Sequence, residues 1–248
     1  MKQVIKYIRG NITLSIILGI LIGVIIIKIS SLTAKPITSF LESIIELNFY
    51  TKNTVFKFFI LGYSILAILL VNNGKLSGFG FNKSIGVKYW SFTLRVIGIS
   101  VASMVVGGVI FMGLLNHLFP KGNTVGFPEQ NSLIQMILTV WIWSSLCEEV
   151  LVRGFIQGFI QDFRTFKVLR LSIPVWVSGL FFGAMHLSLI KAGMGQWFVA
   201  FVVFNTTIIG LLAAYYREKT NSLIPAFWVH FIANAVGSIP LIIKLLTS

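Results

Sequence analysis

Residues 133–160 read LIQMILTVWIWSSLCEEVLVRGFIQGFI, an apolar run long enough to cross a membrane with two adjacent glutamates near its centre. The chain has only seven acidic residues. Five of them fall at or near the edges of apolar runs, where water reaches them: Glu42, Glu46, Glu129, Asp162 and Glu218. Glu148 and Glu149 alone are predicted to lie at bilayer depth. Insertion of a carboxylate there costs at least about 2.5 kcal/mol, so such a residue is expected to face a polar cavity, pair with a cation or take part in chemistry.

The composition is that of a membrane protein with several spans. Charged residues make up 11% of the 248 positions, against about 25% in a soluble domain, and the mean hydropathy is +0.90. A helix needs about 20 apolar residues to cross the hydrocarbon core. Seven runs reach or approach that length: 11–34, 55–72, 92–119, 132–160, 171–190, 196–216 and 223–246. The predicted fold class is all-α, a polytopic membrane helix bundle of about seven transmembrane helices.

The polar stretches between these runs are too short to bury a core of their own. We therefore predict a single membrane domain over residues 1–248. Residues 1–130 are almost purely apolar inside their runs and are interpreted as scaffold helices. Residues 131–248 carry polar and ionisable groups inside theirs and are interpreted as the catalytic core helices. Functional residues are expected between Trp141 and Asn234.

The distribution of basic residues predicts an orientation. Scattered through short loops, they form no patch, so the net charge of +13 does not indicate nucleic-acid binding. If the N-terminus is cytoplasmic, most fall in cytoplasmic segments: Lys2, Lys6, Arg9, Lys75, Lys83, Lys88, Arg164, Lys167, Arg170, Arg217 and Lys219. The outside segments hold fewer: Lys35, Lys52, Lys121, Lys191 and Lys244. Because basic residues favour the cytoplasmic side, we predict a multi-pass cell-membrane protein with a cytoplasmic N-terminus. The glycine-rich segment 73–88 lacks a nucleotide-binding motif and is interpreted as a basic linker.

Glu149 and Arg153 are four residues apart in the fourth run. This spacing predicts an ion pair across one helical turn. Glu148 is rotated by about 100° from its neighbour and is expected to face elsewhere. The two acids can therefore have different roles, with Glu149 and Arg153 as a structural pair.

Two later runs contribute imidazoles. Phe182 and His186 are four residues apart in GLFFGAMH, and His230 and Asn234 are four residues apart in WVHFIANA. Each pair lies on one helix face. A lone histidine in a membrane helix is more often an interhelical hydrogen-bonding group. Together with Glu148, however, the two imidazoles and the carboxamide provide a base, an orienting group and oxyanion donors, which are the parts of a hydrolytic site.

The motifs EExxxR, FxxxH and HxxxN, in that order on successive apolar runs, resemble the CPBP family of intramembrane proteases. That family includes the CAAX prenyl endopeptidases of the Ras-converting type (type II), and its bacterial members also carry labels such as Abi or bacteriocin-immunity protein. The resemblance covers about residues 144–236, while 1–130 match only as generic helices. It implies an intramembrane endopeptidase that hydrolyses a membrane-embedded or membrane-associated peptide, or a CAAX-like C-terminus, in contact with the lipid bilayer.

The resemblance also implies roles for the residues. Glu148 would activate a water molecule with help from His186, while His230 and Asn234 would stabilise the oxyanion. Support for the site would come from Glu149, Arg153 and Phe182. The family is often called a metalloprotease, and Glu148, His186 and His230 are candidate Zn²⁺ ligands. The soluble HExxH arrangement is absent, so dependence on zinc stays open.

Two other functions are compatible with these residues. One is a non-catalytic bacteriocin-immunity or regulatory membrane protein, and the other is a small transporter that uses glutamate and histidine as a relay. The chain lacks the inverted repeats that many transporters show. For the hydrolytic site, we expect Glu148, His186, His230 and Asn234 to converge on one water-filled cavity, because separate desolvation of each group in lipid would be costly. The cavity is expected to open toward the cytoplasm.

Overall fold

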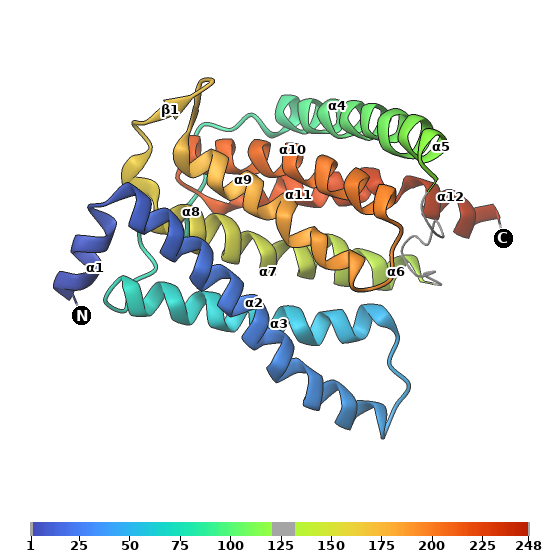
Figure 1. The fold of residues 1–248 in the computed structure, drawn as a ribbon, viewed down its shortest axis with the longest axis horizontal. Helices are drawn as coiled ribbons and strands as arrows, with labels where there is room; N and C mark the ends of the chain where they lie inside the picture. Colours follow the sequence, from blue (N-terminus) through green and yellow to red (C-terminus); the bar gives the residue numbers. More distant parts are fainter. Residues whose placement is uncertain (1, 121–131, 248) are drawn as a thin grey trace.

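The computed structural model describes residues 2–120 and 132–247 as a bundle of long helices (Figure 1). Within these residues, six helices are long and apolar enough to cross a membrane: Ile12–Glu42, Phe49–Val71, Tyr89–Leu118, Leu133–Phe159, Ile173–Ile190 and Gln196–Thr220. A shorter apolar helix, Leu223–Gly237, follows them. The predicted all-α membrane bundle of about seven helices is confirmed. Lys121, Glu129 and the expected scaffold–core boundary after residue 130 lie outside the described residues.

Several of the long helices combine α-helical, π-helical and 3₁₀ segments. In chain order the elements are α1 (Lys2–Arg9), α2 (Ile12–Glu42), α3 (Phe49–Val71), α4 (Tyr89–Gly107), η1 (Gly108–Leu115), α5 (Asn116–Leu118), α6 (Leu133–Met136), η2 (Ile137–Ser144), α7 (Ser145–Glu149), η3 (Val150–Ile156), α8 (Gln157–Phe159), η4 (Gln161–Phe163), β1 (Lys167–Val168), β2 (Leu171–Ser172), α9 (Ile173–Met185), η5 (His186–Ile190), α10 (Gln196–Thr220), α11 (Leu223–Gly237) and α12 (Ile239–Thr247).

Side-chain caps determine where several spans begin. A polar residue with extended backbone precedes each of five helices and accepts a hydrogen bond from a first-turn N–H: Asn11, Asn48, Ser132, Ser172 and Ser222. These caps satisfy donors that a helix leaves unpaired at its start. Pro174 in the first turn of α9 lacks such a donor altogether. The polar residues between the apolar runs therefore define the helix ends.

The helix Leu133–Phe159 is the central element of the bundle and carries both buried glutamates. Its α-helical segment α7, which contains Glu148 and Glu149, lies between the π-helical segments η2 and η3. Every residue from Val150 to Ile156 is buried. Wide π-helical turns often occur at functional sites, where they change the direction of side chains.

The seventh predicted span, 223–246, is wrong as a single helix. α11 ends at Gly237 and α12 begins at Ile239. Between them, the Ser238 N–H bonds back to the carbonyl of Asn234 at 3.0 Å, and Pro240 has no N–H with which to continue the helical ladder. With 15 residues at about 1.5 Å each, α11 is shorter than the hydrocarbon core. A seventh crossing therefore needs α11 and α12 together, with a break at Ser238, one turn after Asn234.

The segment between α3 and α4 is folded onto the bundle. Phe79 is 1% exposed, and a Cβ added at Gly158 would lie 2.6 Å from its ring. Arg217 donates from Nη2 to the Gly78 carbonyl at 3.1 Å. Gly78 and Gly80 have φ of +84° and +90°, a conformation that favours glycine. Residues 73–88 therefore connect α3 and α4 as a linker that is packed against the bundle.

Other loops lie at this same end of the bundle, on the left in Figure 1. Arg9, at the end of α1, pairs with Asp162 at 3.0 Å. The strands β1 and β2 form a two-residue antiparallel hairpin, the only sheet in the described part of the chain. Ser172 at its end donates to Glu218 at the end of α10 at 2.6 Å. The N-terminus, the hairpin and the α10–α11 turn thus define one end of the bundle, which we call the basic end.

Glycines bring α9 and α10 into close contact. A Cβ at Gly183 would lie 1.9 Å from Oγ1 of Thr207, and a Cβ at Gly179 would lie 2.6 Å from the side chain of Leu211. Small residues at helix interfaces permit this approach in membranes. The crossing fixes the C-terminal end of α9, from which His186 projects.

Candidate active site

A cavity of about 930 Å³ lies between α3, the helix Leu133–Phe159, the end of α9 and α11. Its lining includes all four residues expected to form a hydrolytic site: Glu148, His186, His230 and Asn234. They come from three separate helices. The structure therefore brings the predicted set together around one space.

Glu149 and Arg153 form the expected i,i+4 ion pair, with Arg153 Nη1 at 2.8 Å from Glu149 Oε1. Both side chains are almost completely buried. Arg153 also donates from Nη2 to the Gly210 carbonyl at 3.0 Å. Its guanidinium carbon lies 4.3 Å from the centre of the Phe182 ring. Arg153 therefore connects the helix Leu133–Phe159 with α10 and α9.

His230 lies between the two glutamates. Its Nδ1 is 2.9 Å from Glu149 Oε1, and its Nε2 is 3.7 Å from Glu148 Oε2. A carboxylate can only accept, so Nδ1–H donates to Glu149, and this bond fixes the orientation of the imidazole. Nε2 is left facing Glu148 across the cavity. A separation of 3.7 Å exceeds a direct hydrogen bond but suits two groups that share a water molecule.

Glu148 has a cationic partner that sequence reasoning missed. Lys57, on α3, places its Nζ in direct contact with Glu148 Oε1, and both side chains are 7% exposed. Ser144, one turn before Glu148, donates to the same oxygen at 3.0 Å. Oε1 is thus held by two donors, while Oε2 faces His230. A lysine inside the predicted span 55–72 was the available signal, because intramembrane charges tend to be functional.

His186 begins a 3₁₀ turn after α9. Its Nδ1 lies 2.8 Å from the Phe182 carbonyl, so Nδ1–H donates and Nε2 is left for the cavity. The ring of Phe182 packs edge-on against both imidazoles, with ring centres 5.2 Å from His186 and 4.9 Å from His230. Phe182 therefore contacts both histidines and the Arg153 guanidinium.

Asn234 lies on the same face of α11 as His230. Its Nδ2 donates to Ser145 Oγ at 3.0 Å and to the Val140 carbonyl at 3.3 Å. Both amide hydrogens are thus directed at the helix Leu133–Phe159. The carboxamide is fixed at the cavity wall, and the longer bond to Val140 is the weaker of the two.

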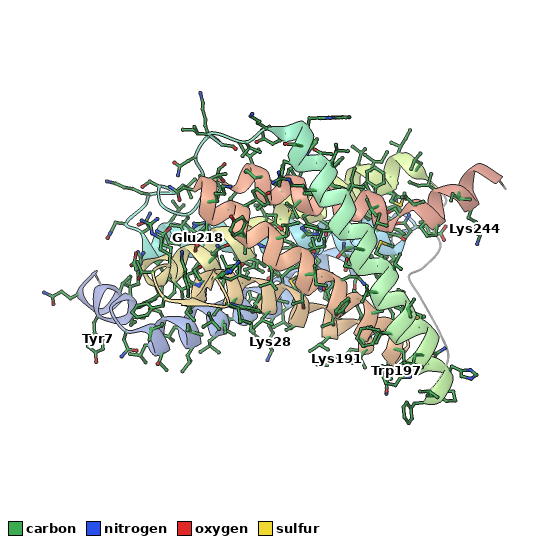
Figure 2. All side chains as sticks on the ribbon, turned by 90° about the horizontal axis from the view of Figure 1, so that it is seen from above. Tyr7, Lys28, Lys191, Trp197, Glu218 and Lys244 are labelled. Atoms are coloured by element: carbon green, nitrogen blue, oxygen red, sulfur yellow. The ribbon has the colours of Figure 1, made fainter. Side chains whose placement is uncertain are left out.

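The cavity reaches the end of the bundle opposite the basic end. Its outer lining comes from the first turn of α3, the turn after α9 and the segment around Ser238, and includes Lys191 and Lys244. Figure 2 shows Lys244 and Trp197 at this end and Tyr7 at the other. A cytoplasmic N-terminus would therefore place this end of the cavity on the outer side of the membrane.

The candidate zinc ligands Glu148, His186 and His230 are not gathered as a metal site. Across residues 2–120 and 132–247, no group of three or more His, Cys, Asp or Glu side chains is close enough to hold a metal ion. Glu148 Oε1 already contacts the Lys57 ammonium, which would repel a divalent cation. The residues do not fit a metal centre in this arrangement, so we derive no step through one.

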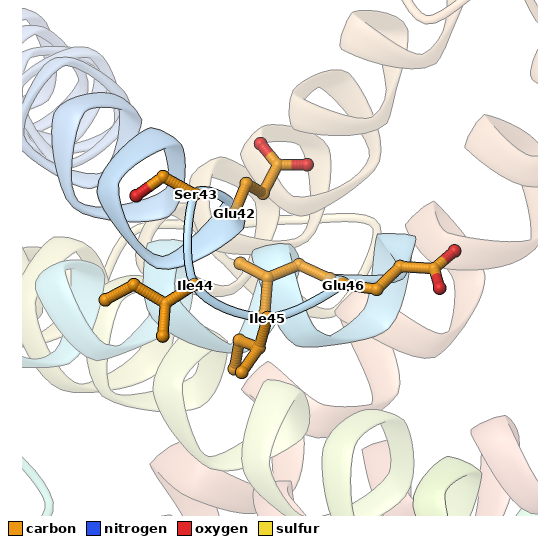
Figure 3. Close-up of a pocket in the computed structure, with 6 residues that line it drawn as sticks. Glu42, Ser43, Ile44, Ile45 and Glu46 are labelled. Carbon is orange, nitrogen blue, oxygen red and sulfur yellow. The ribbon is translucent and has the colours of Figure 1, made fainter.

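A second hollow lies at the turn between α2 and α3 and carries none of these groups. It is lined by six consecutive residues, Glu42 to Leu47 (Figure 3). Glu42 in this turn pairs with Lys52. The lining of this second hollow comes from one turn only, so the hollow is not a candidate site.

A largely apolar cavity that holds a few charged and polar side chains, between helices long enough to cross a membrane, defines this protein as a multi-pass membrane protein with an intramembrane polar site. Residues 130–236 match the family described as type II CAAX prenyl endopeptidase Rce1-like. This segment is therefore assigned as an Rce1-like type II CAAX prenyl endopeptidase (CPBP/Abi) family domain. No curated protein and no solved structure matches the chain. Lys57, Ser238 and Lys244 line the cavity from outside the matched segment.

Proposed function

We propose that this protein is an intramembrane endopeptidase that hydrolyses a peptide bond in a membrane-embedded or membrane-associated substrate. The observation that carries the proposal is the position of His230 between Glu149 and Glu148. One imidazole nitrogen is fixed by Glu149, and the other faces Glu148 Oε2 at 3.7 Å. A water molecule at this point would touch both a carboxylate and an imidazole.

In the proposed reaction, Glu148 is the general base. Its Oε2 takes a proton from the water as the water oxygen attacks the carbonyl carbon of the scissile bond. A base must lie within hydrogen-bonding distance of that water, and such catalysis contributes about 10²–10⁴-fold. On collapse of the tetrahedral intermediate, the C–N bond breaks and Glu148 returns the proton to the leaving amine. The carboxylate is then regenerated without any other reactant.

The developing oxyanion needs donors that are already oriented. His230 can donate from Nε2 when that nitrogen carries a hydrogen, and Glu149, which accepts from Nδ1, holds the ring in the orientation for this bond. Asn234 can contribute by turning one amide hydrogen away from Val140, its longer contact at 3.3 Å. His186, with Nδ1 bonded to the Phe182 carbonyl, presents Nε2 to assist the water. Arg153 and Phe182 keep these groups in place.

We also propose that the whole chain acts as one unit. α3 contributes Lys57 and α2 contributes Val24 to the cavity lining, so the N-terminal helices complete a site whose other residues come from 131–248. Val24 is 48% exposed on the outer surface of the bundle. One wall of the cavity therefore reaches the surface that lipid would cover, which suits lateral entry of a membrane substrate.

For orientation we propose a cytoplasmic N-terminus. The basic end carries Arg9, Arg164, Lys167 and Arg170, and basic loops favour the cytoplasm. The cavity then opens toward the outer face of the membrane, in place of the cytoplasmic opening expected from the sequence. Substrates would be cleaved in the outer half of the bilayer or just beyond it.

Comparison of membrane proteomes tests the proposal. Cells that express the wild type and cells that express Glu148→Gln would be compared for new peptide termini, with equal amounts of folded protein in both. We expect termini that require Glu148, in membrane proteins or lipid-attached peptides. Identical termini in both samples would favour a non-catalytic immunity or regulatory protein.

A further inference from the structure

Lys57 is an exception among the lysines of the membrane helices. It lies on α3 with 6% of its surface exposed. Lys28 on α2, by contrast, is exposed and projects outward from the bundle (Figure 2). A long side chain such as that of Lys28 can carry its charge toward the interface. A buried ammonium needs a partner or a function.

The partner of Lys57 is the proposed base itself. Lys57 Nζ contacts Glu148 Oε1, and Ser144 Oγ donates to the same oxygen at 3.0 Å. Two donors on one carboxylate oxygen fix the rotation of the carboxylate. The other oxygen, Oε2, is left toward His230 Nε2. Lys57 and Ser144 thus determine which oxygen is available to a reacting water.

The backbone around Lys57 is tied to the helix that carries Glu148. Trp143 donates from Nε1 to the Thr54 carbonyl at 3.1 Å, one turn before Lys57. Near the start of α3, Asn48 donates from Nδ2 to Gln135 at 3.0 Å. These contacts keep α3 in register with the helix Leu133–Phe159. The ammonium is therefore held at a fixed place relative to Glu148.

We propose that Lys57 is a positioning residue of the hydrolytic site, which holds Glu148 Oε1 so that Oε2 alone faces the reacting water. The inference rests on the proposed function. It assigns a role to α3, which lies outside the segment matched by the family. Lys57 acts through Glu148 and does not contact the reacting atoms.

Kinetics on purified protein in detergent test this role. The probe is a quenched fluorescent peptide, chosen from a library as the one that the wild type cleaves fastest. Lys57→Ala is compared with Lys28→Ala, the same substitution on an outward-facing lysine. We expect kcat to fall about a hundredfold in folded Lys57→Ala with KM within about twofold, because misplacement of a reacting group affects the chemical step. Lys28→Ala should match the wild type.

Chemical rescue separates positioning from packing. Lys57 lines the cavity, so a small alkylammonium ion such as ethylammonium can occupy the space that Lys57→Ala leaves. We expect it to raise kcat of Lys57→Ala by about tenfold with saturation, since it restores a cation to Glu148, and to leave the wild type and Lys28→Ala unchanged. If Lys57→Ala does not fold, Lys57→Arg is measured. A kcat reduced by about tenfold supports the proposal, because a guanidinium fork does not reproduce a point charge.

Two results would count against these ideas in different ways. The role of Lys57 would be overturned if folded Lys57→Ala or Lys57→Arg had the same kcat as the control variant Lys28→Ala. The proposed function would then remain intact. Equal cleavage by the wild type and Glu148→Gln would instead overturn the proposed function, and the inference with it.

Discussion

Replacement of Arg153 by alanine should unfold or severely destabilise the protein. The guanidinium is 0% exposed and is the cationic partner of Glu149, which is itself 1% exposed. Removal of one member of a buried ion pair typically costs about 3–5 kcal/mol. Loss of the hydrogen bond to the Gly210 carbonyl adds about 1 kcal/mol. Contact with the face of Phe182 adds a further 1 kcal/mol or so.

Together these losses are a large fraction of the stability of a typical domain, which is about 5–15 kcal/mol. His230 still donates to Glu149 in the variant, which argues for the lower part of the range. We therefore expect a loss of about 5 kcal/mol, or roughly several thousandfold in the folded-to-unfolded ratio. The variant should be scarce in membranes and should melt well below the wild type.

The assay is thermal melting of detergent-purified protein, read as the monodisperse fraction by size-exclusion chromatography. Arg95→Ala is the matched control, since Arg95 is an exposed arginine on the membrane helix α4. Arg153→Met combined with Glu149→Gln should recover part of the lost stability, because no buried charge is then left unpaired. The reasoning would be refuted if Arg153→Ala had the same abundance and the same melting temperature as the control variant Arg95→Ala.

Three further predictions follow from the packing, the orientation and the donor set. Gly183→Ala should lower the free energy of unfolding by about 1–3 kcal/mol, because the added Cβ would lie 1.9 Å from Thr207 Oγ1. Gly62→Ala is the control, since it has open space around it and should melt like the wild type. In a Cys147→Ser background, Lys244→Cys should react with an impermeant maleimide in intact cells and Lys83→Cys should not; the reverse pattern would invert the orientation. Peptide cleavage should persist after treatment with a chelator, and loss of activity that added zinc restores would contradict the derived mechanism.

The fold class, and the gathering of the candidate site residues around one cavity, could be predicted because each rests on a local pattern. Apolar runs of about 20 residues predict membrane helices directly. Glu149 and Arg153 pair within one helix, so their spacing of four was sufficient. Charged groups within apolar runs also gave a physical reason to expect one shared cavity.

Interactions between distant segments were beyond local patterns. The contact of Lys57 with Glu148 joins residues 91 positions apart, and nothing in the spacing of either helix indicates it. The rule that intramembrane charges tend to be functional applies to Lys57 as well as to Glu148, but functional residues were expected only between Trp141 and Asn234. The break at Ser238 was missed because hydropathy continues across it. The buried position of Phe79 depends on Gly158, a tertiary contact that glycine-rich composition does not reveal.

The central claim is that Glu148 activates the water that cleaves the substrate. It is tested most directly by turnover of the library-derived quenched peptide with purified wild type and Glu148→Gln, with Glu46→Gln in the exposed α2–α3 turn as control. Glutamine keeps an oxygen that accepts from Lys57 and Ser144, but it leaves the buried Lys57 ammonium without a counter-charge, so the variant should fold with reduced stability, and kcat is compared on folded, monodisperse protein. We predict that it loses at least about a hundredfold in kcat, because an amide cannot take a proton from water. A folded Glu148→Gln that cleaves the peptide at the wild-type rate would contradict the account.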